Sequence, residues 1–179
     1  MERVFSSLVD TVLQKTPTEM AILHGDFPRN SIRTILIPFG ANVHTNLAME
    51  IAPVLAEYFK AKINIAFVFE PGTTKKERDQ KINQINNLIR KYSLATELKV
   101  IMAKDVLKGV VKLSKSADLI LMGGRTGDLM ELLLAKSLTA EITEQAACPV
   151  LWVKEFEERK SFWNALLKPV NKQGAEDER

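Results

Sequence analysis

The stretch DLILMGGRTGDLMELLLAKSL, residues 118–138, constrains the fold more than any other part of the chain. Its first half is an apolar run that ends at Gly123 and Gly124, and its second half, past Gly127, has leucine at helical spacing. This order predicts a buried strand, a tight turn and a helix. Glycine at such a turn lets backbone N–H groups approach a bound anion, and a helix start favours negative charge at the same place. The turn is therefore either a phosphate cradle or a strand-to-helix turn in which glycine has only a structural role.

Short apolar segments with strand character recur along the chain, at residues 19–24, 32–38, 63–69, 98–102, 119–122 and 149–153. Between them lie segments of helical spacing: one that Asn42 caps and that runs to about Tyr58, one from Lys75, and one that Asp105 caps. From residue 32 onward, five strands alternate with four helices. This predicts an α/β fold with a Rossmann-like, doubly wound, parallel five-stranded sheet. Ligands of such a sheet bind beyond the carboxyl ends of the strands, which here means the loops after Pro38, Phe69 and Met122.

Length and composition favour one cytoplasmic domain. The chain has 179 residues with 46% hydrophobic content, which suits a single core. The net charge of +3 is scattered, so we expect no nucleic-acid partner. Cys148 is the single cysteine, which excludes an internal disulfide, and no apolar run approaches the roughly 20 residues of a membrane span.

The chemistry-bearing residues do not assemble into a catalytic pattern. No Ser-His-Asp set, metal-ligand cluster or pair of carboxylates falls near the predicted strand ends. Asp105 and Asp118 are interpreted as a helix cap and a strand-start residue. We therefore predict that the protein is not an enzyme and has no catalytic or metal-binding residues.

The first helix and strand repeat the last ones at a fixed offset of 130 residues (137 − 7). Ser7 and Leu8 match Ser137 and Leu138, and the segment Met20–Leu23 matches Val150–Val153. We therefore predict that residues 1–25 are the helix-strand remnant of a preceding copy of the domain. If the end strands of the two copies pair across a pseudo-twofold axis, residues 20–23 should lie antiparallel to 150–153, within one chain or swapped from a second. This would add an antiparallel edge strand to the parallel sheet. Chance similarity of two helix-strand units is the alternative.

The predicted α/β domain spans residues 31–155, and the chain changes character after it. Residues 156–168 carry Phe162, Trp163, Leu166 and Leu167 on one stripe, which predicts an amphipathic helix. Residues 169–179 lack a core-forming pattern and are predicted to be disordered.

The motifs over residues 31–154 together resemble the universal stress protein domain. They are ILIPFG at 35–40, the pattern Leu47-Ala48-x-Glu50-x-Ala52, DLILMGGRTG at 118–127, and SLTAEI followed by Cys148-Pro149-Val150. The resemblance implies the strand order 3-2-1-4-5 and homodimers through the fifth strand. Taken with the repeat, it predicts a homodimer through the fifth strand and the N-terminal strand.

The resemblance also implies a nucleotide site, and this chain departs from its pattern. ATP-binding members carry an Asp soon after the first strand, where this chain has Gly40, and a Gly-x-x-Gly, nine residues, Gly-Ser/Thr signature. With Ser137 in register, Lys136 takes the place of the last glycine and only Gly123 remains of the first pair. With Gly124 and Gly127 in register, Ser137 and Leu138 end the motif. Binding of ATP or AMP is therefore expected to be weak or absent, although Lys136 also suits a phosphate. The candidate ligand-binding residues are Gly40, Asn42, Gly123, Gly124, Arg125, Gly127, Lys136 and Ser137.

A first-strand loop without Asp, preceded by the end of another copy, is similar to the universal-stress-type domains at the cytoplasmic ends of membrane transporters. This resemblance implies a non-enzymatic regulatory or interaction module, cytoplasmic in location, whose partner is the membrane part of a transporter. The alternative is a free-standing universal stress protein that binds ATP or AMP.

Overall fold

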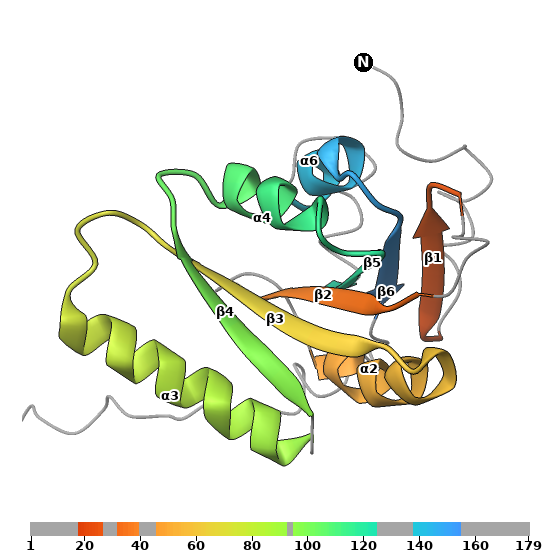
Figure 1. The fold of residues 1–179 in the computed structure, drawn as a ribbon, viewed down its shortest axis with the longest axis horizontal. Helices are drawn as coiled ribbons and strands as arrows, with labels where there is room; N and C mark the ends of the chain where they lie inside the picture. The colour runs from red at the N-terminus through yellow and green to blue at the C-terminus, as the bar shows by residue number, and fades with distance from the viewer. Residues whose placement is uncertain (1–17, 27–31, 40–45, 93–94, 125–137, 155–179) are drawn as a thin grey trace, which may run out of the picture.

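The sheet has six strands in the order β1-β6-β5-β2-β3-β4 (Figure 1). The computed structural model describes residues 18–26, 32–39, 46–92, 95–124 and 138–154. All neighbouring strands run parallel except β1, which is antiparallel to β6. The predicted order of the five parallel strands, 3-2-1-4-5, is therefore confirmed. The strands are β1 (Met20–His24), β2 (Thr34–Phe39), β3 (Lys62–Phe69), β4 (Thr96–Met102), β5 (Leu119–Gly124) and β6 (Val150–Lys154).

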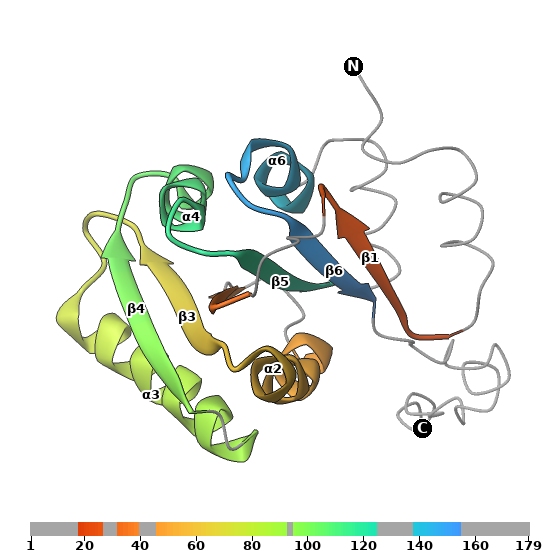
Figure 2. The same ribbon diagram turned by 45° about the vertical axis from the view of Figure 1, so that its right-hand side comes forward.

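Helices cover both faces of the sheet (Figures 1 and 2). On one face lie α2 (Asn46–Phe59) and α3 (Lys75–Lys91), and on the other lie α4 (Val106–Ser114) and α6 (Leu138–Gln145). Each face has its own apolar cluster. Ile35, Ile65 and Ile85 belong to the cluster under α2 and α3, and Leu36, Val110 and Trp152 to the one under α4 and α6. This is the doubly wound arrangement that alternating strands and helices predict.

Local sequence explains where α3 and α4 begin. Thr74 and Glu77 form a capping box at α3, in which each side chain accepts a hydrogen bond from the other residue's backbone N–H. Asp105 caps α4 by accepting from the Leu107 N–H at 2.9 Å. The interpretation of Asp105 as a helix cap is thus confirmed.

The N-terminal strand covers the edge of β6, as the internal repeat predicts. Ala21 lies opposite Val153, Ile22 opposite Trp152 and Leu23 opposite Leu151, all within one chain. The connection to β2 is ample, because the nine residues 25–33 reach about 30 Å and three strand spacings amount to about 15 Å. The pairing therefore needs no exchange with a second chain.

The structure corrects one part of the predicted turn. Gly123 and Gly124 are not a turn, because they continue β5 and pair with Val153 and Lys154. The neighbouring strand supplies this extension: β6 runs to Lys154, and its ladder draws two more residues of β5 into the sheet. Predicted strand limits shift elsewhere by one or two residues, and β4 begins at Thr96 instead of Leu98.

Other predictions fall outside the described residues. They are the Asn42 cap, the helix predicted past Gly127 up to residue 137, the helical parts of 1–25 and 156–168, and the tail 169–179. Among the residues that the structure describes, no helix combines the length and apolar character of a membrane span.

Candidate functional site

The candidate site is the point where the strand order reverses, between β2 and β5. The chain moves outward from β2 to β3 and β4, and then returns to the other side of β2 with β5 and β6 (Figure 2). Loops that follow two such strands lead away in opposite directions. In open α/β sheets the crevice they leave at the carboxyl edge is the usual place for a ligand.

The two strands pair over only a short stretch. β2 pairs with β5 at Ile35–Leu119 and Leu36–Ile120, whereas its pairing with β3 continues to Phe39. Pro38 accounts for this difference. The Arg33 carbonyl accepts a hydrogen bond from the first residue of β3, and the Thr34 carbonyl accepts one from the Asp118 N–H. Backbone groups of successive strand residues point to alternate sides, so those of residue 38, like those of residue 34, point toward β5. Proline has no N–H to donate there, and the ladder between β2 and β5 stops short of the carboxyl edge.

At the amino edge of the sheet, hydrogen bonds of Asp118 hold β2 and β5 together. One carboxylate oxygen of Asp118 accepts hydrogen bonds from the backbone N–H groups of Arg33 and Thr34, both at 2.9 Å. The Asp118 N–H donates to the Thr34 carbonyl at 3.0 Å. β2 and β5 are therefore held together at their amino ends and left unpaired toward their carboxyl ends, which opens the sheet at the candidate site.

Three phenylalanines pack beside this opening, on the face of α2 and α3. The Phe39 and Phe67 ring centroids are 6.3 Å apart, and those of Phe67 and Phe69 are 4.5 Å apart. The Lys81 ammonium lies 5.8 Å from the Phe67 ring centroid. The sequence pattern places Phe67 and Phe69 only as strand residues, and it ends the preceding strand one residue before Phe39. Their alternation in 67–69, level with the last residue of β2, is the signal that groups them.

The predicted site residues are only partly within the described chain. Gly123 and Gly124 end β5 at this edge, and continuing the register of β2 with β5 brings Phe39 level with Gly123. Gly40 follows Phe39 directly in the sequence. The remaining candidates, Gly40, Asn42, Arg125, Gly127, Lys136 and Ser137, lie outside the described residues.

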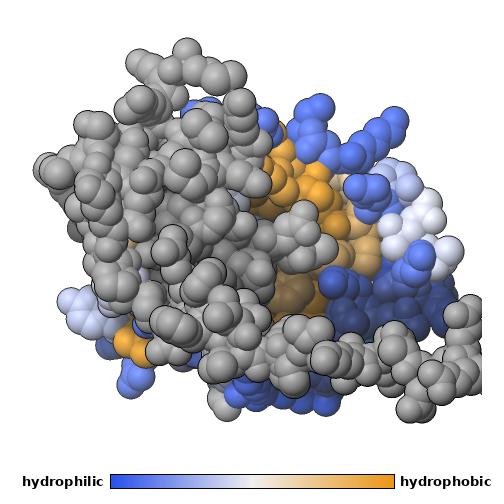
Figure 3. Space-filling model, turned by 180° about the vertical axis from the view of Figure 1, so that it is seen from behind, coloured by the Kyte–Doolittle hydropathy of each residue, from blue (hydrophilic) through white to orange (hydrophobic). Residues whose placement is uncertain are grey.

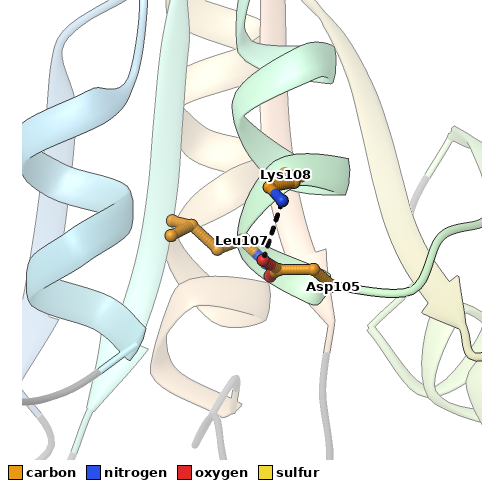
Figure 4. A network of polar contacts seen from close by, with 3 residues as sticks. All are labelled: Asp105, Leu107 and Lys108. Atoms are coloured by element: carbon orange, nitrogen blue, oxygen red, sulfur yellow. Dashed lines mark hydrogen bonds and ion pairs between the residues drawn. The ribbon is translucent and has the colours of Figure 1, made fainter.

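The carboxylate nearest to the end of β4 is already engaged (Figure 4). Asp105 accepts from the Leu107 N–H through one oxygen, and its other oxygen lies 4.0 Å from the Lys108 ammonium. The Ala103 N–H donates to the Phe69 carbonyl at 3.0 Å and ties this loop to β3. Asp105 thus serves the start of α4.

The single cysteine is a poor nucleophile in this fold. Burial raises the pKa of the Cys148 thiol to about 11, the negative charge of Asp118 acts in the same direction, and a hydrogen bond with the Ile120 backbone opposes both. The thiolate is the reactive form, so little of it is present near neutral pH. Within the described ranges, no three His, Cys, Asp or Glu side chains are grouped so as to hold a metal ion.

No model of a known protein family matches the sequence, and neither does any curated protein. Solved structures do match. A universal stress protein in complex with cAMP superposes with a TM-score of 0.54 at 18% identity, over 69% of this chain and 97% of that protein. A universal stress protein from Archaeoglobus fulgidus in complex with dAMP gives 0.55 at 13% identity, over 70% of this chain and 100% of that one.

A universal stress protein from Archaeoglobus fulgidus DSM 4304 superposes with a TM-score of 0.60 at 18% identity. The match covers 83% of this chain but 54% of that protein, so the chain spans about half the length of this relative. Identities this low show the fold alone. The sheet order, the antiparallel edge strand and the helices on both faces match the Rossmann-like fold of universal stress proteins.

Proposed function

Because the chain has the fold of the universal stress proteins, we propose that it is a non-enzymatic cytoplasmic regulatory or interaction module with a degenerate nucleotide site. The membrane part of a transporter is its proposed partner. Binding of ATP or AMP is proposed to be weak or absent.

The observation that carries the degenerate site is the combination of an open switch point and the glycine that follows it. The pairing of β2 with β5 ends at Leu36 and Ile120, beside the point where the strand order reverses, and this is where sheets of this type bind a nucleotide. Gly40, directly after β2, stands where the ATP-binding members have an Asp. A missing carboxylate removes a charged hydrogen bond, which is worth about 1.5–3 kcal/mol.

The role as an interaction module rests on β1. Its register with β6 is symmetric: position 22 lies opposite 152, and these two residues are equivalent in the repeat of offset 130. The pair Met20–Lys154 then maps onto His24–Val150, and Ala21–Val153 onto Leu23–Leu151. A pseudo-twofold axis between two end strands requires this relation. It supports the proposal that residues 1–25 derive from a preceding copy, as in chains where this domain is appended to another protein.

The alternative function is a free-standing universal stress protein that binds ATP or AMP. Two of the similar structures favour it, since they were solved with cAMP and dAMP. The two glycines that end β5 also leave room for a ligand to approach the backbone.

Calorimetric titration of the full chain with ATP, AMP and cAMP tests the nucleotide site. We expect no binding in the low micromolar range. The variant Gly40→Asp should bind ATP about tenfold or more tightly than the wild type, since it restores a charged partner. Ser116→Asp is the matched control, because it introduces the same carboxylate at an exposed position of the turn before β5, at the opposite edge of the sheet. Low-micromolar ATP binding by the wild type would establish the alternative function.

The transporter partner is tested separately by fractionating the cells that express the protein. An antibody raised against the purified chain should detect it in the membrane fraction. Detection in the supernatant alone would contradict the transporter proposal and leave the result on nucleotide binding unaffected.

A further inference from the structure

The edge strand β4 is exposed in a way that edge strands usually avoid. In the part of the chain that the structure describes, no strand lies beyond β4 (Figure 1). The Ala103 N–H donates a hydrogen bond to a carbonyl of β3. Backbone groups of successive strand residues point to alternate sides, so those of Leu98, Val100 and Met102 point away from β3, out of the sheet. Proteins commonly protect such an edge with proline, a bulge or charged side chains, and charges of one sign repel a second copy of the same strand. β4 contains no proline, and its two charges, Glu97 and Lys99, have opposite signs.

Apolar side chains accompany these free backbone groups. Val100 is 41% exposed and Met102 51% exposed, although both lie within a strand of the central sheet. The molecule also exposes apolar surface elsewhere, since Figure 3, which views the face opposite to that of Figure 1, shows an apolar area beside hydrophilic residues. β1, the strand at the other end of the sheet, has no large apolar side chain that is exposed to this degree. The exposed apolar strand edge of the described sheet is therefore β4.

The charges on β4 complement a second copy of the same strand. Glu97 and Lys99 are two residues apart and point to the same face of the sheet, that of α4. Neither side chain has an ion pair within the described residues. In an antiparallel pair of β4 strands with Leu98 on the twofold axis, Glu97 of each chain lies opposite Lys99 of the other. Leu98 then exchanges backbone hydrogen bonds with its copy, and each charge pair occupies a position where side chains are closest.

The alternative registers are less favourable. A shift that puts Lys99 on the axis brings two ammonium groups together, and a shift to Val100 places each Lys99 opposite Ile101. The charges therefore select the register centred on Leu98.

We infer that two copies of this chain associate through their β4 edges, antiparallel and centred on Leu98, to form one continuous twelve-stranded sheet. This dimer differs from the predicted one through the fifth and N-terminal strands, and it does not depend on the proposed function. Its Glu97–Lys99 pairs make it sensitive to salt.

Sedimentation equilibrium of the full chain over a range of concentrations measures the dimer. Glu97→Lys should raise its dissociation constant about tenfold or more, because like charges then face each other twice. The double variant Glu97→Lys/Lys99→Glu should restore the wild-type value, since the pairs return with exchanged signs. Glu57→Lys, on the exposed side of α2, is the control for the change in net charge.

Cross-linking checks the register. In a Cys148→Ser background, a mixture of Glu97→Cys and Lys99→Cys chains should form a disulfide faster than either chain alone. A wild-type chain that stays monomeric at millimolar concentration would overturn the inference. A dissociation constant that Glu97→Lys leaves unchanged would also overturn it, as would a double variant that does not return to the wild-type value.

Discussion

At the scale of single residues, the fold changes the acidity of Cys148. Burial, with the nearby Asp118 carboxylate, favours the neutral thiol and raises its pKa from 9.0 to about 11. In the unfolded chain the thiol ionises at the lower value. The neutral thiol therefore contributes stability that is fully present below pH 9 and is lost as the pH rises from 9 toward 11.

This leads to a prediction for the wild type and a Cys148→Ala variant. Between pH 9 and 11 the wild type should lose unfolding free energy relative to the variant, which has no thiol to ionise. Urea titrations at several pH values measure the difference, with iodoacetamide alkylation at pH 8 as a second readout. Alkylation should be slow in the native protein and fast in urea. Parallel pH profiles of the two proteins would show that the thiol is not shielded.

Single residues also show how far local sequence reaches. The role of Asp105 was predictable because a helix cap bonds an N–H only two residues away. Asp118 was interpreted as a strand-start residue, and it does precede β5. Its clamp on Arg33 and Thr34 joins segments more than 80 residues apart, however, and no local pattern encodes such a pair.

At the scale of elements, α4 depends on a glycine that its own helical propensity would disfavour. A Cβ atom at Gly109 would lie 2.9 Å from both Val68 Cγ2 and Ile101 Cδ1. The helix therefore approaches β3 and β4 more closely than any other residue type at position 109 would allow. Gly109 is one of the buried residues of α4.

Gly109→Ala should consequently destabilise the protein. The substitution gains about 0.5–1 kcal/mol of helix propensity, but overpacking typically costs about 1–3 kcal/mol. We expect a net loss of about 1 kcal/mol, measured as a lower urea midpoint with an unchanged slope. In a Val68→Ala/Ile101→Val background the same substitution should become neutral or stabilising, because both close contacts of the added methyl group are then removed. A stabilising effect in the wild-type background would contradict the close packing of α4.

Elements also show where sequence patterns stop. Apolar runs predicted all six strands because burial leaves a direct mark on composition. The end of β5 was placed too early, because Gly123 and Gly124 are kept in the strand by the partner β6. Strand ends depend on neighbours in the sheet, whereas helix starts depend on caps within a few residues. The end of the β2–β5 pairing beside Pro38 likewise depends on residues far apart in the sequence. The sequence therefore located the candidate site from the strand order only.

At the scale of the whole molecule, β1 is the element that closes the sheet. The repeat of 130 residues predicted both its partner and its direction, and the structure confirms them. Pairing with β1 occupies the backbone groups of β6 that β5 does not use. The Ile120 N–H donates to the Pro149 carbonyl, so alternation directs Leu151 and Val153 to β5 and Val150, Trp152 and Lys154 to β1.

Removing β1 should therefore expose one specific set of amides. A chain that starts at Arg29 lacks residues 20–24, so the edge of β6 becomes a template for association. We expect aggregation, or a new dimer built on residues 150–153, together with faster hydrogen exchange at the Trp152 amide. The amides of Leu151 and Val153 are the internal control, because their bonds to β5 remain. A truncated chain that stays monomeric, with unchanged stability and unchanged protection at Trp152, would contradict the pairing and with it the interpretation of residues 1–25 as part of a preceding copy.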